Sequence, residues 1–319
     1  MPTYAEQPAW RAIQEFLPAE YRLTPQTEPE EEWWEPQEHR WGHRIHLDTY
    51  RNPAATAKVI LFHGVGTNGR QMSMILGRPL ADLGYETIAI DMPTYGLTDV
   101  APGTRVTYDD WVRIGSDLID AELARDDRPI VLYGLSAGGM ETYHVAALNQ
   151  RVKGIVGMTF LDTALFRVRF ETAFDPVTGT LGAPLMRLLS RIGLGRVRLP
   201  MRFVSKMRAL VNDRAAKRAT YRDKTSAGNS VSIAFLDSWL SYRPAVAAED
   251  FDVCPVLLTQ PAADKWTPLH LSEPFLSRIT RVPVTTVMLD NGGHYPLEKS
   301  ALDQMVLTIA EFVAEVTEE

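Results

Sequence analysis

The sequence of 319 residues has few of the features that mark secreted, metal-binding or membrane-spanning proteins. Its single cysteine, Cys254, excludes a disulfide within the chain, which fits a reducing compartment, and we expect a cytoplasmic protein. No apolar run is long enough to span a bilayer, and the opening residues MPTYAEQPAW lack the pattern of a signal peptide. The histidines do not fall at metal-ligand spacings, so we expect no metal.

Charge is distributed unevenly along the chain. The net charge of −7 argues against a general nucleic-acid binder. Residues 1–40 carry a net charge of −6, whereas residues 167–224 carry fourteen Lys and Arg against four acidic residues, a net charge of +10. Because Pro and Glu dominate residues 1–40, we predict an extended or irregular acidic arm, and Trp33 and Trp34 indicate that it docks on another surface. One hypothesis is that its glutamates lie against the basic segment and neutralise it.

Short apolar runs alternate with helical patterns from residue 41 onward. Buried strands are predicted at KVILF (58–62), ETIAI (86–90), PIVLY (129–133), KGIVGMTF (153–160), CPVLLTQ (254–260) and PVTTVML (283–289). This alternation predicts the α/β class, with a doubly wound, mostly parallel sheet covered by helices on both faces. Ligands bind such sheets at the carboxyl ends of the strands. The residues that follow the predicted strands there are His63, Asp91, Ser136, Asp162, Asp264 and His294.

The segment GLSAGGM (134–140) lies between a predicted buried strand and a predicted helix. A serine hydroxyl becomes a nucleophile when a base, an orienting acid and oxyanion donors surround it. Small residues here permit a sharp turn that presents Ser136 at the start of the helix, with the N–H of Ala137 as an oxyanion donor. His294 and Asp264 follow later strands and are candidates for the base and the acid. The alternative is a tight turn whose small residues only ease packing.

The segments LFHGVGTNGR, AIDMPTYGLT, LYGLSAGG, PAADKWTP and GGHYPLE occur in this order and resemble the motifs of the α/β-hydrolase family. The resemblance covers a core of residues 41–162 and 246–319, and leaves out the arm of residues 1–40. It implies Ser136 as nucleophile, His294 as base, Asp264 as its partner and Val65 as the second oxyanion N–H donor. Asp162 is the second choice for the acid. The resemblance also implies a helical cap, residues 163–245, inserted after the sixth strand of the family's sheet, at the position of KGIVGMTF (153–160) in this sequence.

The charge of the predicted cap has three interpretations. The basic residues form a solvated face, or they create a field that attracts an anionic substrate, or they form a surface for weak contact with a membrane. The last interpretation rests on Leu, Met, Ile and Phe residues that are mixed with Arg, as in interfacial helices. The sequence does not predict an oligomeric state.

Together these features predict a serine hydrolase that cleaves carboxylic esters or lactones through an acyl-enzyme on Ser136 and needs no cofactor. We expect Tyr95 and Trp266 at the rim of the pocket as substrate contacts. An apolar cap suits an acyl chain, so an acyl-homoserine lactone (quorum-signal) lactonase and a lipase-like enzyme both fit. A thioesterase, a C–C hydrolase and an acyltransferase of the same fold stay open, as does a non-catalytic protein that binds a small molecule.

Overall fold

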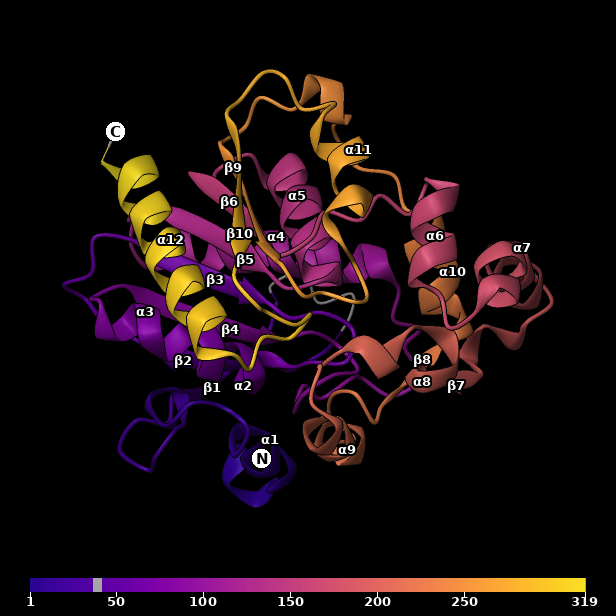
Figure 1. The fold of residues 1–319 in the computed structure, drawn as a ribbon, viewed down its shortest axis with the longest axis horizontal. Coiled ribbons are helices and arrows are strands. Elements are labelled where there is room, and N and C mark those ends of the chain that lie inside the picture. Colours follow the sequence, from indigo (N-terminus) through magenta and orange to yellow (C-terminus); the bar gives the residue numbers. More distant parts are fainter. Residues whose placement is uncertain (37–41, 319) are drawn as a thin grey trace.

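The computed structural model describes residues 1–36 and 42–318. They contain an eight-stranded sheet with the order β1-β2-β4-β3-β5-β6-β9-β10 (Figure 1). Neighbouring strands from β4 to β10 are parallel, whereas β2 pairs antiparallel with β1 and with β4. This confirms the predicted mostly parallel sheet. The strands are β1 (Glu30–Trp34), β2 (Ile45–Tyr50), β3 (Lys58–Phe62), β4 (Glu86–Asp91), β5 (Ile130–Gly134), β6 (Gly154–Gly157), β9 (Val256–Pro261) and β10 (Val284–Leu289).

Helices cover both faces of the sheet, which explains why all five residues of β3 are buried. Helices α3 and α12 lie together on one face, and α4 and α5 on the other (Figure 1). The predicted N-cap Thr107 is confirmed, because its side chain accepts the N–H of Asp110 at the start of α4. The core helices are α2 (Gly69–Met72), the π-helical turn η3 (Ser73–Gly77), α3 (Arg78–Asp82), α4 (Tyr108–Arg125), α5 (Ala137–Asn149), η6 (Ala248–Asp250), η7 (Leu269–Leu271), α11 (Glu273–Leu276) and α12 (Lys299–Thr317).

Between β6 and β9 the chain leaves the sheet and forms a mainly helical layer, residues 163–245, which we call the cap segment. It lies on the right-hand side of Figure 1 and includes one short antiparallel strand pair. Its elements are α6 (Phe166–Thr172), α7 (Pro176–Arg191), η4 (Leu194–Arg196), β7 (Arg198–Pro200), α8 (Met201–Val204), η5 (Met207–Ala209), α9 (Arg214–Arg222), β8 (Ser230–Ser232) and α10 (Ile233–Ser241). In the part of the chain that the structure describes, no helix has the length and apolarity needed to cross a membrane.

The described part of the N-terminal segment, residues 1–36, is not the extended or irregular arm that its composition predicts. It forms η1 (Tyr4–Glu6), α1 (Ala9–Gln14), η2 (Ala19–Tyr21) and the edge strand β1. Tyr4 and Trp10 are fully buried, and Trp33 pairs with His46 of β2. The predicted docking of this segment is confirmed at Trp33, but the extended or irregular backbone was not, because a few spaced aromatic side chains hold short regular elements on the core despite the many Pro and Glu residues. The predicted boundary at residues 40 and 41 lies outside the described residues.

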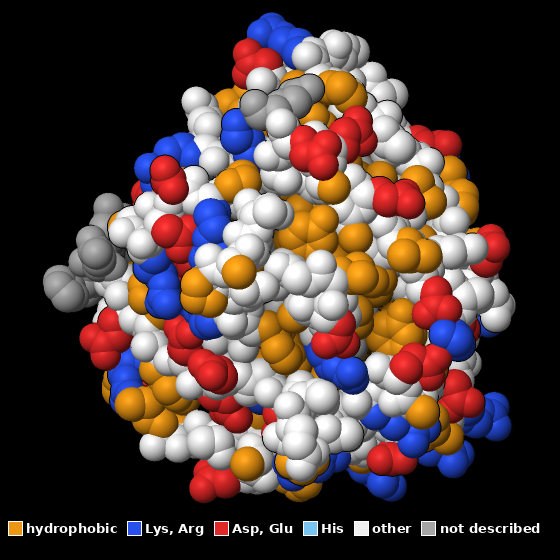
Figure 2. Space-filling view, turned by 90° about the vertical axis from the view of Figure 1, so that its left-hand side faces the viewer, with side chains coloured by type: hydrophobic (Ala, Val, Ile, Leu, Met, Phe, Trp, Pro, Cys, Tyr) orange, Lys and Arg blue, Asp and Glu red, His pale blue; other side chains and the backbone are white. Residues whose placement is uncertain are grey.

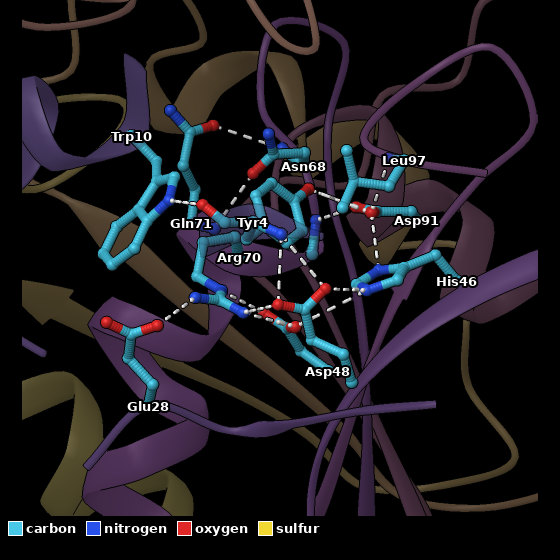
Figure 3. Close-up of polar contacts among 12 residues, drawn as sticks. Tyr4, Trp10, Glu28, His46, Asp48, Asn68, Arg70, Gln71, Asp91 and Leu97 are labelled. Carbon is cyan, nitrogen blue, oxygen red and sulfur yellow. Dashed lines mark hydrogen bonds and ion pairs between the residues drawn. The ribbon is translucent and has the colours of Figure 1, made fainter. Parts of the chain in front are cut away.

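A buried polar network anchors this segment to the sheet (Figure 3). The Tyr4 hydroxyl donates to Asp91 at 2.9 Å, and the Tyr4 N–H donates to Glu31 at 3.0 Å. The imidazole of His46 lies between these two carboxylates, 2.9 Å from Asp91 and 3.0 Å from Glu31. Burial opposes a charge on His46, but the two carboxylates outweigh burial and raise its pKa to about 10. Asp91 therefore ends a strand, as expected, but contributes to anchoring the N-terminal segment.

Helix α1 packs against α9 of the basic segment, but among the described residues no glutamate of residues 1–36 forms an ion pair with that segment, so direct pairing of the two charges is not observed. Six of these eight glutamates pair instead with basic residues of the core and of their own segment: Glu15 with Arg22, Glu20 with Lys299, Glu28 with Arg11 and Arg70, Glu31 with Arg70, Glu32 with Arg51 and Arg125, and Glu35 with Arg44. Of the fourteen Lys and Arg in residues 167–224, only Arg167 forms an ion pair with a carboxylate of the described residues. The basic charge of the cap segment is thus left largely unpaired.

Candidate active site

Ser136 occupies the turn between β5 and α5 in a strained backbone conformation. Its φ is 55° and its ψ is −118°, a region that non-glycine residues rarely adopt. The turn is fixed on both sides, since Leu135 donates its N–H to Phe62 and Gly139 donates its N–H to the Ser136 carbonyl. A Cβ atom on Gly134 would lie 1.9 Å from the carbonyl oxygen of Gly138, so only glycine fits there. This strained turn is the geometry of a nucleophile elbow.

Asp264 and His294 come together at the carboxyl ends of β9 and β10. The Oδ2 atom of Asp264 lies 2.9 Å from Nδ1 of His294, and both side chains are buried. Burial raises the pKa of Asp264, but the His294 imidazole and backbone N–H groups of Thr267 and Trp266 outweigh it and lower the pKa to about 2. An ionised Asp264 holds the proton of His294 on Nδ1, which leaves Nε2 as the basic nitrogen.

The Nε2 atom of His294 is buried and has no hydrogen-bond partner among residues 1–36 and 42–318. It is therefore not hydrogen-bonded to the Ser136 hydroxyl in this structure. Catalytic hydrogen bonds are often long in the absence of substrate and shorten only when substrate binds.

Thr267 completes this cluster and was not predicted as a site residue. Its hydroxyl donates to Asp264 Oδ2 at 2.8 Å and lies 3.1 Å from His294 Nδ1. Asp264 Oδ1 accepts the N–H groups of Trp266 at 2.7 Å and Thr267 at 2.9 Å. An Asp side chain that binds the backbone two and three residues onward is typical of turns. That turn brings the Thr267 hydroxyl beside the carboxylate. The Asp-Lys-Trp-Thr order in TQPAADKWTP is compatible with such a turn, but it does not specify the contact of the hydroxyl.

Asp162, the second choice for the acid, lies in a different environment. Its carboxylate accepts the N–H of Ala164 at 2.8 Å and is 3.3 Å from Arg278. Asp264, and not Asp162, contacts His294.

The loop after β3 packs directly against the elbow. A Cβ atom on Gly64 would lie 2.8 Å from Cβ of Ser136, so the loop approaches closely only because residue 64 has no side chain. His63 fixes this loop: its Nε2 accepts the N–H of Met92 at 3.0 Å, so its Nδ1 donates to the Gly64 carbonyl at 2.9 Å. Burial lowers the pKa of His63, which keeps it neutral. These contacts give His63 a structural role, as expected.

A cavity of about 130 Å³ lies between the elbow and the cap segment. Ser136, Val65 and Ala137 line it together, so the predicted nucleophile and both predicted oxyanion donors meet at one surface. The rest of its wall is mainly apolar and comes mostly from the cap segment, including Met186, Met201, Val204, Leu236, Trp239 and Leu240. Arg169 is the charged residue of this lining, and its guanidinium donates to the carbonyls of Thr163 and Ala164. This space suits an apolar chain attached to a reactive carbonyl.

The two predicted substrate contacts differ in position. Trp266 lines the cavity, and its ring centroid lies 4.6 Å from that of His294. Tyr95 is buried against His63, with 5.1 Å between ring centroids, and lies outside the lining of the cavity. The structure therefore brings Trp266, but not Tyr95, to the predicted nucleophile.

The remaining candidate residues have structural surroundings. His144 lies 3.0 Å from the Tyr108 hydroxyl, and burial lowers its pKa to about 3. Cys254 is buried, which raises its pKa to about 12 and fits an inert thiol. His39 lies outside the described residues. Within those residues, no group of three or more His, Cys, Asp or Glu side chains is arranged to hold a metal ion.

Comparisons with known proteins agree with this fold. A model of the alpha/beta hydrolase family matches residues 59–306. No curated protein sequence matches the chain. The fold is similar to a soluble variant of monoglyceride lipase from Saccharomyces cerevisiae solved with a substrate analog (TM-score 0.70, 16% identity, covering 93% of this chain and 98% of that one). It is also similar to a monoacylglycerol lipase from Paleococcus ferrophilus (0.65, 18%, 85% and 99%) and to a carboxyl esterase from Bacillus coagulans (0.65, 14%, 90% and 98%).

Proposed function

Since this chain belongs to the alpha/beta hydrolase family, we propose that it is a serine hydrolase that cleaves carboxylic esters, including lactones, through an acyl-enzyme on Ser136. The observation that carries this proposal is the buried Asp264–His294 pair, 2.9 Å apart, at the same edge of the parallel sheet as a strained serine turn that lines an apolar cavity. Each part has a cost in strain or desolvation that a purely structural role does not require.

The proposed chemistry gives each of these groups one role. Ser136 Oγ attacks the substrate carbonyl while His294 Nε2 takes up its proton. The N–H groups of Val65 and Ala137 hold the oxyanion, and the N-terminus of α5 favours the developing negative charge. His294 then protonates the leaving alcohol, and in the second half it activates water, which releases the acid from Ser136. Asp264 stabilises the imidazolium in both halves.

The cavity favours substrates with an apolar acyl part. Its wall from the cap segment is built of Met, Leu, Val and Trp side chains, which gain free energy when they bury hydrocarbon. This chain shares its fold with a monoglyceride lipase and a monoacylglycerol lipase, and this likeness of fold supports a lipase-like activity by analogy. We therefore expect acyl esters of medium or long chain to be better substrates than short, polar esters.

The test is hydrolysis of p-nitrophenyl esters of increasing chain length by the wild type and by Ser136→Ala. We expect the substitution to lower kcat by several orders of magnitude, because it removes the nucleophile, while the fold is kept. Near-normal hydrolysis by Ser136→Ala would exclude the acyl-enzyme. A fluorophosphonate should label the wild type and leave Ser136→Ala unlabelled. If it labels neither, a non-catalytic binding protein becomes the better account.

A further inference from the structure

The outer surface of the cap segment is unusually apolar. Fifteen large apolar side chains are exposed among the described residues, and ten of them lie between residues 166 and 203. These ten are Phe166, Phe170, Val177, Leu181, Leu185, Leu188, Ile192, Leu194, Val197 and Phe203. Single exposed apolar residues are ordinary on protein surfaces, but a concentration within one short segment marks a surface that contacts something else.

Helix α7 and its C-cap residue Ile192 carry half of this set along one face. Val177, Leu181, Leu185, Leu188 and Ile192 are separated by three or four residues, which is the spacing of a single helical stripe. Different residues of the same helix, Gly179, Gly182, Ala183 and Met186, line the cavity that holds Ser136. Helix α7 therefore separates the cavity from the surface of the molecule. One side of the helix lines the cavity, and the other exposes an apolar stripe.

The charge around this stripe has one sign. Residues 176–212 contain seven Lys and Arg and no Asp or Glu. Arg187 and Arg191 are exposed next to Leu188 and Ile192, and none of the seven forms an ion pair with a carboxylate of the described residues. By contrast, the opposite side of the molecule, shown in Figure 2, carries acidic and basic side chains interspersed. Unpaired arginines beside exposed Leu and Phe match a surface that offers both hydrocarbon and anionic groups.

We propose that the cap segment docks on an anionic lipid surface through α7 and its neighbours, with Leu181, Leu185 and Leu188 entering the interface and Arg187 and Arg191 contacting the head groups. The occupant is a lipid surface because a second copy of this chain would bring equal positive charges together. Docking in this orientation places the wall of the cavity against the lipid.

Vesicle flotation tests this proposal, and using the Ser136→Ala protein keeps it independent of any hydrolysis. Two vesicle types serve as probes: phosphatidylcholine alone, and an equal mixture of phosphatidylcholine and phosphatidylserine. We expect binding to the mixed vesicles that weakens as salt is added, because the Arg contribution is screened. The double variant Leu181→Gln/Leu188→Gln should lose at least tenfold in binding, and Arg187→Gln/Arg191→Gln should bind both vesicle types equally weakly.

The matched control is Leu307→Gln, which removes a similarly exposed leucine from α12, on the side of the core away from the cap segment. It should bind vesicles like the parent protein. The same four leucine and arginine substitutions in the otherwise wild-type chain should leave hydrolysis of a water-soluble ester unchanged, since none of these residues lines the cavity. The proposal is wrong if the parent protein floats with neither vesicle type, or if Leu307→Gln weakens binding as much as the α7 pair. A dimer in solution that Leu181→Gln/Leu188→Gln dissociates, without vesicle binding, would also overturn it.

Discussion

Asp264 Oδ2 lies 2.9 Å from His294 Nδ1, although thirty residues and a whole β-strand separate the two side chains. Both lie in loops at the same edge of the sheet, because β9 and β10 are parallel neighbours with Pro261 opposite Leu289. The register of two strands therefore determines whether the acid and the base meet.

Asp264→Asn should lower kcat by roughly three to four orders of magnitude with a small change in KM. The amide keeps the shape of the side chain but presents an N–H group to His294, which favours the tautomer with its proton on Nε2. That tautomer cannot accept the proton of Ser136. Steady-state kinetics on a chromogenic ester measure the effect. Asp162→Asn is the matched control and should keep near-normal activity, since Asp162 contacts Arg278 and Ala164. An equal loss in both variants would contradict the assignment of Asp264.

Thr267→Val should reduce kcat by roughly tenfold, the size expected for losing one buried hydrogen bond to a charged group. The hydroxyl donates to Asp264 Oδ2, so its loss loosens the carboxylate that orients His294. Thr267 does not line the cavity, so KM should stay nearly constant. Thr267→Ser keeps the hydroxyl and should restore most of the activity. If Thr267→Ser is as slow as Thr267→Val, the hydroxyl has no positioning role.

The strand–helix pattern was predictable because its physical cause is local. Strands such as KVILF are buried on both faces and read as continuous apolar runs, and Thr107 is a recognisable N-cap. Ser136, Asp264 and His294 could be proposed as site residues because each follows such a strand, and the structure brings Asp264 into contact with His294. The hydrogen bond from Thr267 depends on side-chain geometry within one turn, which spacing alone does not determine.

The N-terminal segment was mispredicted for a different reason. Its composition is dominated by Pro and Glu, but its stability depends on long-range contacts of a few side chains. Tyr4 binds Asp91, which is 87 residues away, and Arg70 pairs with Glu28 and Glu31. Composition measures the average character of a segment and does not show which other segments its residues contact.

The buried His46 predicts a loss of stability in alkaline solution. Because its pKa rises from about 6.5 in an unfolded chain to about 10 in the fold, its stabilising effect is complete below about pH 6.5 and disappears as the pH rises through about 10. Urea unfolding across this range should show a decreasing free energy of unfolding. His46→Gln should be less stable at neutral pH and should lose part of this slope. If the free energy of unfolding of His46→Gln decreases with pH as steeply as that of the wild type, groups other than His46 cause the effect.

Two glycines one turn apart in α7 should respond oppositely to alanine. A Cβ atom at Gly179 would lie 2.7 Å from Cα and 2.9 Å from the carbonyl oxygen of Phe170, so α6 and α7 cannot stay at their present separation. At Gly182 the nearest atom is the Thr178 methyl group at 3.7 Å, an ordinary contact. Both substitutions gain the same helix propensity of about 1 kcal/mol, so their difference isolates the clash.

We expect Gly182→Ala to raise the stability of the cap segment by up to about 1 kcal/mol and Gly179→Ala to lower it by about 1–3 kcal/mol. Hydrogen exchange of the α6 and α7 amides is the suitable measurement, because it reports the local opening of these helices separately from global unfolding. Slower exchange in Gly182→Ala and faster exchange in Gly179→Ala would support the close packing of α6 on α7. Slower exchange in both variants would mean that the two helices separate easily, and that the wall of the cavity is not held by this contact.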